Sequence, residues 1–190
     1  SSKASIFKIS GDSHVILKNI VFVNANGTDG GAIYVESGST IEIINCTFLD
    51  NFASNNGGAI FIADSLTSTS LGHHSTIENS SFANCYSSGD GGAVYIRTDN
   101  VIVENVEFAH NTAGDDGGAI YWEGDYGTIY NITCENNKGI SLNDSNSNGG
   151  TICITGNNIT LIDSTFKNSS AVAYGGAIYV TGNGVNIETS

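Results

Sequence analysis

The chain has 190 residues, a hydrophobic fraction of 39% and a formal net charge of −13. Six Lys and Arg against 19 Asp and Glu argue against nucleic-acid binding, because such binding needs cations that displace counterions from phosphates. The hydrophobic fraction argues against a disordered chain, and no apolar run is long enough for a membrane-spanning helix. Gly, Asn, Ser and Thr together make up 86 residues, which disfavours long helices.

A repeat organises the whole chain. The dipeptide Gly-Gly begins at positions 30, 57, 91, 117, 149 and 175. The intervals of 27, 34, 26, 32 and 26 residues indicate a base period of about 26 with two inserts. A short apolar segment follows each dipeptide, at residues 32–35, 59–62, 93–96, 119–122, 151–154 and 177–180. We expect the inserts to form loops over residues 64–75 and 138–148.

A second anchor, Asn-x-x-Phe, lies between the Gly-Gly sites. Its asparagines are Asn19, Asn45, Asn79, Asn105 and Asn131, and its phenylalanines are Phe22, Phe48, Phe82, Phe108 and Phe166. The fifth repeat has Cys134 in place of Phe, and the sixth has Asp163 in place of Asn. Six repeats that agree at this many positions predict six copies of one structural unit.

The period predicts an all-β fold, a right-handed parallel β-helix of about six coils with three short strands per coil. A period of about 26 residues is too short for two packed helices but suits three strands and three turns. Each strand would pair with its equivalent in the next coil, about 4.8 Å away, so that every core position becomes a column of like residues. The right hand follows the general preference of parallel crossovers.

We expect residues 1–190 to form a single β-helix segment. Because the chain begins Ser1-Ser2-Lys3 and contains no Met, we also expect this segment to be a fragment of a longer surface protein.

Each column has a physical role in this fold. Ile33 and Val35 alternate across one strand and would fill the interior, where the Phe column stacks. The Asn column would stand at a bend, since Asn tolerates left-handed backbone and its amide can bond the same amide one coil away. The Gly-Gly sites would supply positive φ or close approach at another bend.

An aromatic column follows the Gly-Gly dipeptides: Tyr34, Phe61, Tyr95, Tyr121 and Tyr179, with Cys153 in the fifth repeat. If Ile33 and Val35 face inward, these rings face outward and form a lateral surface for sugars or a partner. Two other arrangements stay open: the rings pack under a loop or a neighbouring face, or they face inward and the aliphatic residues face out.

The pairing of Gly-Gly-Ala with Phe-x-x-Asn resembles the repeats of the chlamydial polymorphic outer-membrane protein family and of adhesin-like surface proteins of methanogenic archaea. Five of six repeats carry Gly-Gly-Ala, and Phe-x-x-Asn is complete at residues 48–51 and 108–111. The resemblance covers nearly the whole chain. It implies a right-handed β-helix exposed at the cell surface and used for adhesion, with host or neighbouring-cell surfaces, glycans or proteins as partners.

The β-helix is also a fold of polysaccharide lyases and hydrolases. Asp115-Asp116 is similar to the paired aspartates of polygalacturonases, which act as acid and base. The pair falls where other repeats carry Asp29, Asn56, Asp90 and Asn148, so we interpret it as one rung of a structural column. The basic residues of such enzymes have no counterpart nearby.

Three further patterns concern metals and covalent modification. The acidic column Asp29, Asp90, Asp115 and Asp116 could bind Ca²⁺, although its spacing matches no recognised calcium motif. The adjacent His73 and His74 point opposite ways in an extended insert, which disfavours a shared metal. Asn-x-Ser/Thr motifs make glycosylation plausible, if the host glycosylates, at Asn26, Asn143, Asn158 and Asn168.

The four cysteines, an even count, allow disulfides. The fifth repeat loses both its Phe, to Cys134, and its Tyr, to Cys153, which suggests that these two pair across the coil. That pairing conflicts with an outward aromatic column, because Cys134 should face inward. The sequence leaves the conflict open.

These patterns favour a non-catalytic extracellular adhesin-like domain that attaches to cells or glycans through its lateral face and two inserts. One alternative is a structural stalk or filament subunit whose open coil ends stack on another copy, since an uncapped β-helix exposes strand edges. The other alternative is a polysaccharide lyase or hydrolase that uses Asp115 or Asp116. We expect no nucleic-acid partner and no membrane span in this segment.

Overall fold

The computed structural model describes residues 4–63, 74–142 and 146–189, which form short parallel strands in four sheets and contain no helix. Sheet A contains β1 (Phe7–Ile9), β5 (Ile33–Val35), β9 (Ile60–Ile62), β13 (Val94–Ile96), β17 (Ile120–Trp122), β21 (Ile152–Ile154) and β24 (Ile178–Val180). Sheet B contains β2 (His14–Lys18), β6 (Thr40–Ile44), β10 (Thr76–Glu78), β14 (Ile102–Glu104), β18 (Thr128–Tyr130), β22 (Thr160–Ile162) and β25 (Asn186–Glu188).

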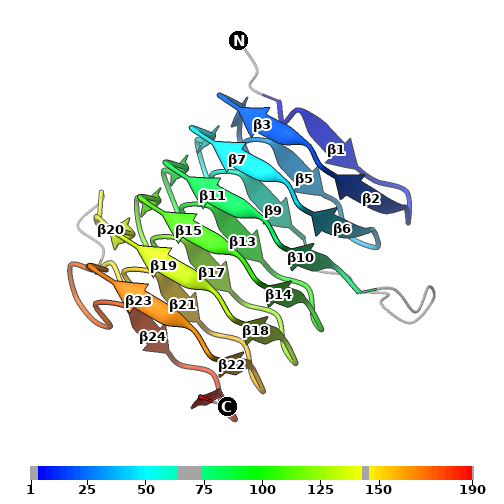
Figure 1. Ribbon diagram of the computed structural model, residues 1–190. Helices are drawn as coiled ribbons and strands as arrows, with labels where there is room; N and C mark the ends of the chain where they lie inside the picture. Colours follow the sequence, from blue (N-terminus) through cyan, green and yellow to red (C-terminus); the bar gives the residue numbers. More distant parts are fainter. Residues whose placement is uncertain (1–3, 64–73, 143–145, 190) are drawn as a thin grey trace.

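The other two sheets complete each coil. Sheet C contains β3 (Val21–Val23), β7 (Thr47–Leu49), β11 (Ser81–Ala83), β15 (Glu107–Ala109), β19 (Thr133–Glu135) and β23 (Thr165–Lys167). Sheet D contains β4 (Asn26–Gly27), β8 (Phe52–Ala53), β12 (Tyr86–Ser87), β16 (Thr112–Ala113) and β20 (Lys138–Gly139). The chain runs through sheets A, B, C and D in turn and then begins the next coil, so the coils stack into a rod (Figure 1).

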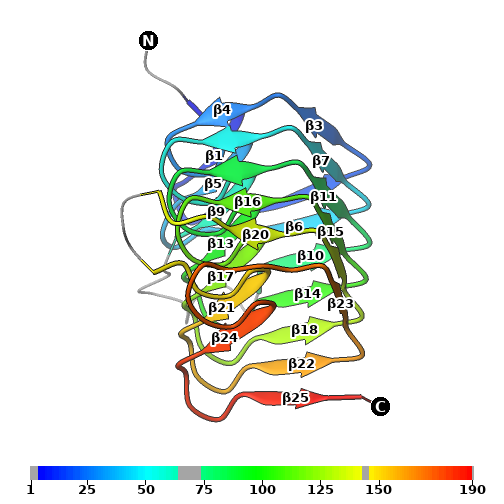
Figure 2. The same ribbon diagram turned by 90° about the vertical axis from the view of Figure 1, so that its left-hand side faces the viewer.

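Every strand pairs in parallel with its equivalent in the neighbouring coil, and the chain termini lie at opposite ends of the stack (Figure 2). The predicted parallel β-helix is therefore confirmed, but the prediction of three strands per coil is wrong. A fourth strand, only two residues long, follows the Phe strand in five coils. Such a strand is too short to produce a visible alternation of apolar and polar residues. Among the described residues no helix could cross a membrane.

The interior is filled by the aliphatic and Phe columns. Ile33 and Val35 are fully buried. The rings of Phe48 and Phe82 stack with centroids 4.6 Å apart and an interplanar angle of 2°, and Phe22 and Phe108 extend the stack at 4.8 and 5.0 Å. The register places Cys134 after Phe108, and the partly buried Phe166 follows it. The predicted Phe column is confirmed as an interior stack that Cys134 interrupts.

The predicted Asn column stands at the bend between sheets B and C. Each of its five members has a left-handed backbone, with φ between 49° and 58°. The Asn45 Nδ2 donates to Asn19 Oδ1 at 2.6 Å, and Asn131 Nδ2 donates to Asn105 Oδ1 at 2.7 Å. The bend and these two amide bonds between coils are as predicted, and the column lies at the solvent-exposed edge of the rod.

A second asparagine column is buried, and the sequence pattern alone did not reveal its role. It consists of Asn51, Asn111 and Asn137, each three residues after the Phe position. Asn111 Oδ1 accepts a hydrogen bond from Cys85 N at 2.9 Å, while its Nδ2 donates to Phe82 O at 3.0 Å. The Asn of Phe-x-x-Asn thus satisfies backbone groups at the bend of the preceding coil, where no backbone partner is available.

Restoring this column where it is broken should stabilise the protein. Cys85 occupies an Asn position, and its Sγ makes only long contacts, 3.6 Å to Ala83 O, 3.8 Å to Phe48 O and 4.0 Å to Asn51 Nδ2. Cys85→Asn should therefore raise the free energy of unfolding by about 1 kcal/mol, and Asn111→Ala should lower it by about 1–3 kcal/mol. Urea unfolding measures both. The exposed Asn26→Ala, expected within about 0.5 kcal/mol of the parent, is the control, and equal effects of all three would contradict a buried ladder.

The two glycines of each Gly-Gly site have different roles. The first has positive φ, for example 62° at Gly91. In every pair but the last the second glycine has no room for a side chain; a Cβ on Gly92, for example, would lie 2.0 Å from Gly118 O and 2.6 Å from the carbonyl carbon of Thr112. The turn from sheet D to sheet A is therefore packed directly against the backbone of the next coil. Both predicted reasons for the glycines apply, one at each position.

Candidate functional site

The aromatic column lies on the outer face of sheet A. Tyr34 is half-buried between the fully buried Ile33 and Val35, and the register aligns it with Phe61, Tyr95 and Tyr121. None of these rings belongs to the interior core cluster. The structure therefore selects the outward orientation among the arrangements that the sequence left open.

The outward rings stack on one another. Tyr34 and Phe61 have centroids 5.4 Å apart, Phe61 and Tyr95 5.0 Å, and Tyr95 and Tyr121 4.9 Å, with interplanar angles of 8°, 19° and 19°. The faces of the rings are consequently covered by their neighbours, and Phe61 and Tyr95 are only 6% and 8% exposed. A ligand on this column would meet ring edges and hydroxyls rather than open faces. Binding by the column and by Tyr179 stays a prediction.

Charged residues follow the aromatic column on one side. Tyr95 Oη donates to Glu123 Oε2 at 3.0 Å, and Arg97 Nε pairs with the same carboxylate oxygen at 3.1 Å. At the first coils, Lys8 Nζ lies 5.9 Å from the centre of the Tyr34 ring and 3.1 Å from Glu36 Oε1. Burial, and next the charge of Glu123, raises the pKa of Tyr95 well above its usual range, so this hydroxyl remains a hydrogen-bond donor at neutral pH.

The acidic column follows the aromatic column on the other side and forms a ladder of side-chain oxygens. Asp29 Oδ1 accepts from Asn56 N at 3.1 Å, and Asn56 Oδ1 accepts from Asp90 N at 2.9 Å. Asp90 Oδ1 accepts from Asp116 N at 3.0 Å, and Asp116 Oδ1 accepts from Asn148 N at 2.7 Å. Asp and Asn perform the same task, which supports the structural interpretation of this column.

Asp115 stands beside this ladder rather than in it. Its backbone N donates to Gly89 O at 3.1 Å, and its carboxylate adds to the negative charge around Asp90 and Asp116. Burial, and next the charges of Asp115, Asp116 and Glu123, raises the pKa of Asp90 to about 6, against a hydrogen bond from Asp116 N that lowers it. Burial also raises the pKa of Asp116.

Stability should therefore fall as the pH rises through this range. The carboxyl of Asp90 titrates near 3.9 when unfolded and at about 6 when folded, so the folded state holds its proton longer and loses stability from about pH 4 to pH 6. Asp90→Asn keeps the acceptor oxygen that Asn56 supplies one coil earlier. It should raise the free energy of unfolding at pH 7 by on the order of 1 kcal/mol.

Urea unfolding at pH 4.5, 6 and 7.5 measures this effect. Asp99→Asn makes the same charge change in a second ladder, where Asp99 Oδ1 accepts from Asp125 N at 2.7 Å, and it is the matched control. The difference in stability between Asp90→Asn and the parent should grow with pH, and by more than the difference between the exposed Asp99→Asn control and the parent. A difference that is constant from pH 4.5 to 7.5 would contradict the assignment.

The described residues contain no group of three or more His, Cys, Asp and Glu side chains that could hold a metal ion. Asn56 separates Asp29 from Asp90 in the stack, and the Oδ1 atoms of Asp29, Asn56 and Asp90 are already bonded to backbone N–H groups. The Ca²⁺ hypothesis therefore gains no support from the geometry. His74 is exposed, and His73 lies outside the described residues.

The predicted pairing of Cys134 with Cys153 is wrong, because both are free thiols. Cys134 faces the interior between Phe108 and Phe166, whereas Cys153 lies on the outer face of sheet A between Tyr121 and Tyr179. Cys153 Sγ is 3.9 Å from Asp116 Oδ2. Burial raises the pKa of both thiols above the usual range. The outward aromatic column thus removes the conflict that the sequence left open.

Three of the predicted glycosylation positions, Asn26, Asn158 and Asn168, are exposed, and Asn143 lies outside the described residues. Glycosylation of these positions stays a prediction. Of the two predicted loops, residues 74–75, 138–142 and 146–148 are described, and they include β20 at the start of the second.

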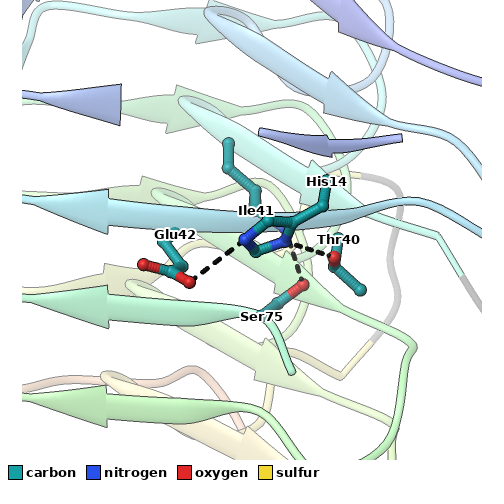
Figure 3. A network of polar contacts seen from close by, with 5 residues as sticks. All are labelled: His14, Thr40, Ile41, Glu42 and Ser75. Atoms are coloured by element: carbon teal, nitrogen blue, oxygen red, sulfur yellow. Dashed lines mark hydrogen bonds and ion pairs between the residues drawn. The ribbon is translucent and has the colours of Figure 1, made fainter. Parts of the chain in front are cut away.

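A polar cluster on sheet B was not anticipated from the sequence. His14 Nδ1 forms a 2.8 Å hydrogen bond with Thr40 Oγ1, and His14 Nε2 lies 3.1 Å from Glu42 Oε1 (Figure 3). The hydroxyl of Ser75 accepts from Ile41 N at 3.2 Å from the following coil. These contacts tie β2 to β6 and β6 to the next coil, so their evident role is to fix the register of three successive coils.

Parallel strands in four sheets around one apolar interior define a parallel β-helix. The chain belongs to the right-handed beta helix region family, whose model matches residues 9–188. The match confirms the predicted hand and repeat architecture. Searches of curated proteins and of solved structures found no significant match.

Proposed function

We propose that this β-helix is a non-catalytic, extracellular adhesin-like domain that attaches to cells or glycans. The observation that carries the proposal is that the carboxylates of Asp90 and Asp116 have a structural role: each accepts a hydrogen bond from a backbone N–H of the next coil. Glycoside cleavage needs two carboxyl groups that face a substrate, one to donate a proton and one to act as base or nucleophile. Carboxylates that hold the stack together are poorly placed for either role.

Two further features support attachment. The outer faces of the rod carry repeated rows of side chains, which suits contact with a repeating polymer or an extended surface. The surface location rests on the resemblance of the Gly-Gly-Ala and Phe-x-x-Asn repeats to those of adhesin-like proteins.

Retention and cleavage should be measured together on the purified chain. We expect retention on at least one member of a panel of acidic and neutral polysaccharides, or on cells, with no new reducing or unsaturated ends. New ends that disappear in Asp115→Asn or Asp116→Asn would overturn the proposal in favour of a lyase or hydrolase. Asp99→Asn is the control for the loss of one negative charge in a ladder.

The stalk or filament alternative is favoured by one observation, the last coil of the stack. Phe166 and Ile178 are only partly buried there, Ile187 is 52% exposed, and a hollow of about 450 Å³ opens among them. A second copy that stacks on this coil would cover the apolar residues and pair the free strand edges. Sedimentation velocity over a range of concentrations tests this, with Ile187→Lys expected to abolish any assembly. A monomer at all concentrations would reject it.

A further inference from the structure

A polar hollow of about 460 Å³ lies along the corner between sheets C and D. It crosses three successive coils and is lined by His110, Thr112, Asn136, Lys138, Asn168 and Ser170. Figure 2 shows β16 and β20 side by side on the face turned to the viewer, with the chain that follows β23 in the next coil. We call this feature the C–D hollow.

The fold places the same two positions of each coil in the C–D hollow. His110, Asn136 and Asn168 form the bend after sheet C, and all three have left-handed φ, between 50° and 58°. Thr112 and Lys138 are partners in register, and Ser170 forms an isolated bridge with Lys138. The hollow is therefore a small grid of two columns and three rows, with rows about 4.8 Å apart.

The side chains of the C–D hollow are free to bind. Backbone groups among these residues are hydrogen-bonded to neighbouring coils, but none of the six side chains makes a hydrogen bond or ion pair with another described residue, although together they carry amides, hydroxyls, an imidazole and an ammonium. In the acidic column, by contrast, the polar side chains are bonded from coil to coil, as between Asp90 and Asp116. Unbonded donors and acceptors that converge on one hollow are the features of a polar ligand site.

The charge of the C–D hollow is opposite to that of the molecule. No carboxylate lines it, although the chain has 19 Asp and Glu and only six Lys and Arg. Three other hollows among the described residues contain Glu36, Glu107 and Glu188 respectively. Lys138 supplies an ammonium to the lining. On the adjoining sheet C, Glu135 and Lys167 are partners in register, and their opposite charges offset each other.

We propose that the C–D hollow binds an anionic saccharide, an inference that rests on the proposed attachment function and names its ligand class. The ammonium of Lys138 would hold the carboxylate or sulfate group by charge-assisted hydrogen bonds. The amides of Asn136 and Asn168 and the hydroxyls of Thr112 and Ser170 would bond sugar hydroxyls, which both donate and accept. Three equivalent rows suit a chain whose units repeat along the rod.

Calorimetric titration with three hexasaccharides tests the assignment: a sulfated heparin fragment, a galacturonate hexamer and neutral cellohexaose. The protein should come from a bacterial host without N-glycosylation, so that Asn168 carries no glycan. We expect binding of at least one anionic probe, weakened about tenfold by Lys138→Gln. Lys167→Gln is the matched control, because it removes the same charge one sheet away, and it should change the affinity less than twofold.

The outcomes separate the two ideas. Binding of the sulfated or of the carboxylated probe alone would identify the anionic group. Anionic binding that Lys138→Gln and Asn136→Ala both leave unchanged would overturn the assignment of the hollow while leaving attachment intact. Equal binding of cellohexaose would overturn the anionic class. Binding that depends on Lys138 together with new reducing ends would keep the site and reject the non-catalytic function, and no binding to any glycan or cell would reject both.

Discussion

Phe82→Ala is expected to lower the free energy of unfolding by about 3–5 kcal/mol. The ring is fully buried and stacks between Phe48 at 4.6 Å and Phe108 at 5.0 Å. Truncation removes apolar area and also both stacking contacts, and the rigid sheets on either side cannot close over the space. Urea unfolding at constant pH measures the loss.

The control for this substitution is another stacked ring outside the interior. Phe52 is half-buried on sheet D, with its ring 5.5 Å from that of Tyr86. Phe52→Ala should cost much less than Phe82→Ala, since part of its surface already contacts water. A cost at Phe52 equal to or above that at Phe82 would show that the Phe column does not dominate the core.

Gly92→Ala should lower the free energy of unfolding about as much as Phe82→Ala, because it overfills a tightly packed site instead of leaving a cavity. The added methyl would overlap Gly118 O at 2.0 Å and the carbonyl carbon of Thr112 at 2.6 Å, both backbone atoms that side-chain motion cannot relieve. The coils would have to separate locally. We expect a loss of about 3 kcal/mol or more, at the upper end of the range for overpacking, together with a lower yield of folded protein.

Gly176→Ala provides a matched control within the same motif. Gly176 is also the second glycine of a Gly-Gly pair, but its nearest neighbour to a new Cβ is Ser169 O at 3.9 Å, an ordinary contact. This variant should be neutral or slightly stabilising, because alanine restricts the unfolded chain. If both alanine variants destabilise equally, the requirement for glycine is conformational rather than steric.

Much of the fold could be predicted from the sequence because each position of a β-helix stacks on its own equivalent. The Phe and Gly-Gly motifs recur at regular intervals, and aligning the repeats on them identifies which residues of successive coils are neighbours. The buried asparagine ladder was harder to identify, because Cys85 and Ala25 interrupt its column. The strands of sheet D, two residues each, are too short to show an alternation of apolar and polar residues, and only a small residue recurs at their second position.

The surfaces could be predicted less well than the core. The alternation in Ile33-Tyr34-Val35 predicts that the ring lies on the opposite face of the strand from the aliphatic side chains. It does not predict which of the two faces is turned to the interior. The pairing of Cys134 with Cys153 failed because their positions belong to different faces of different sheets. One column of the C–D hollow changes from Thr112 to Lys138 to Ser170, and the other, with His110, Asn136 and Asn168, has the Asn that is common at bends, so neither column marked a site. The absence of acids at these positions is the signal that could have found it.

The bonds between coils all run along the rod, and this direction has a mechanical consequence. A pull on the two ends of the chain would load one coil at a time, so the protein would unwind from an end instead of yielding as a whole. Each 26-residue coil would release about 90 Å of extended chain, and the coils of 34 and 32 residues would release more. Under load, such a molecule lengthens in discrete steps, one coil at a time, and each step relieves part of the tension.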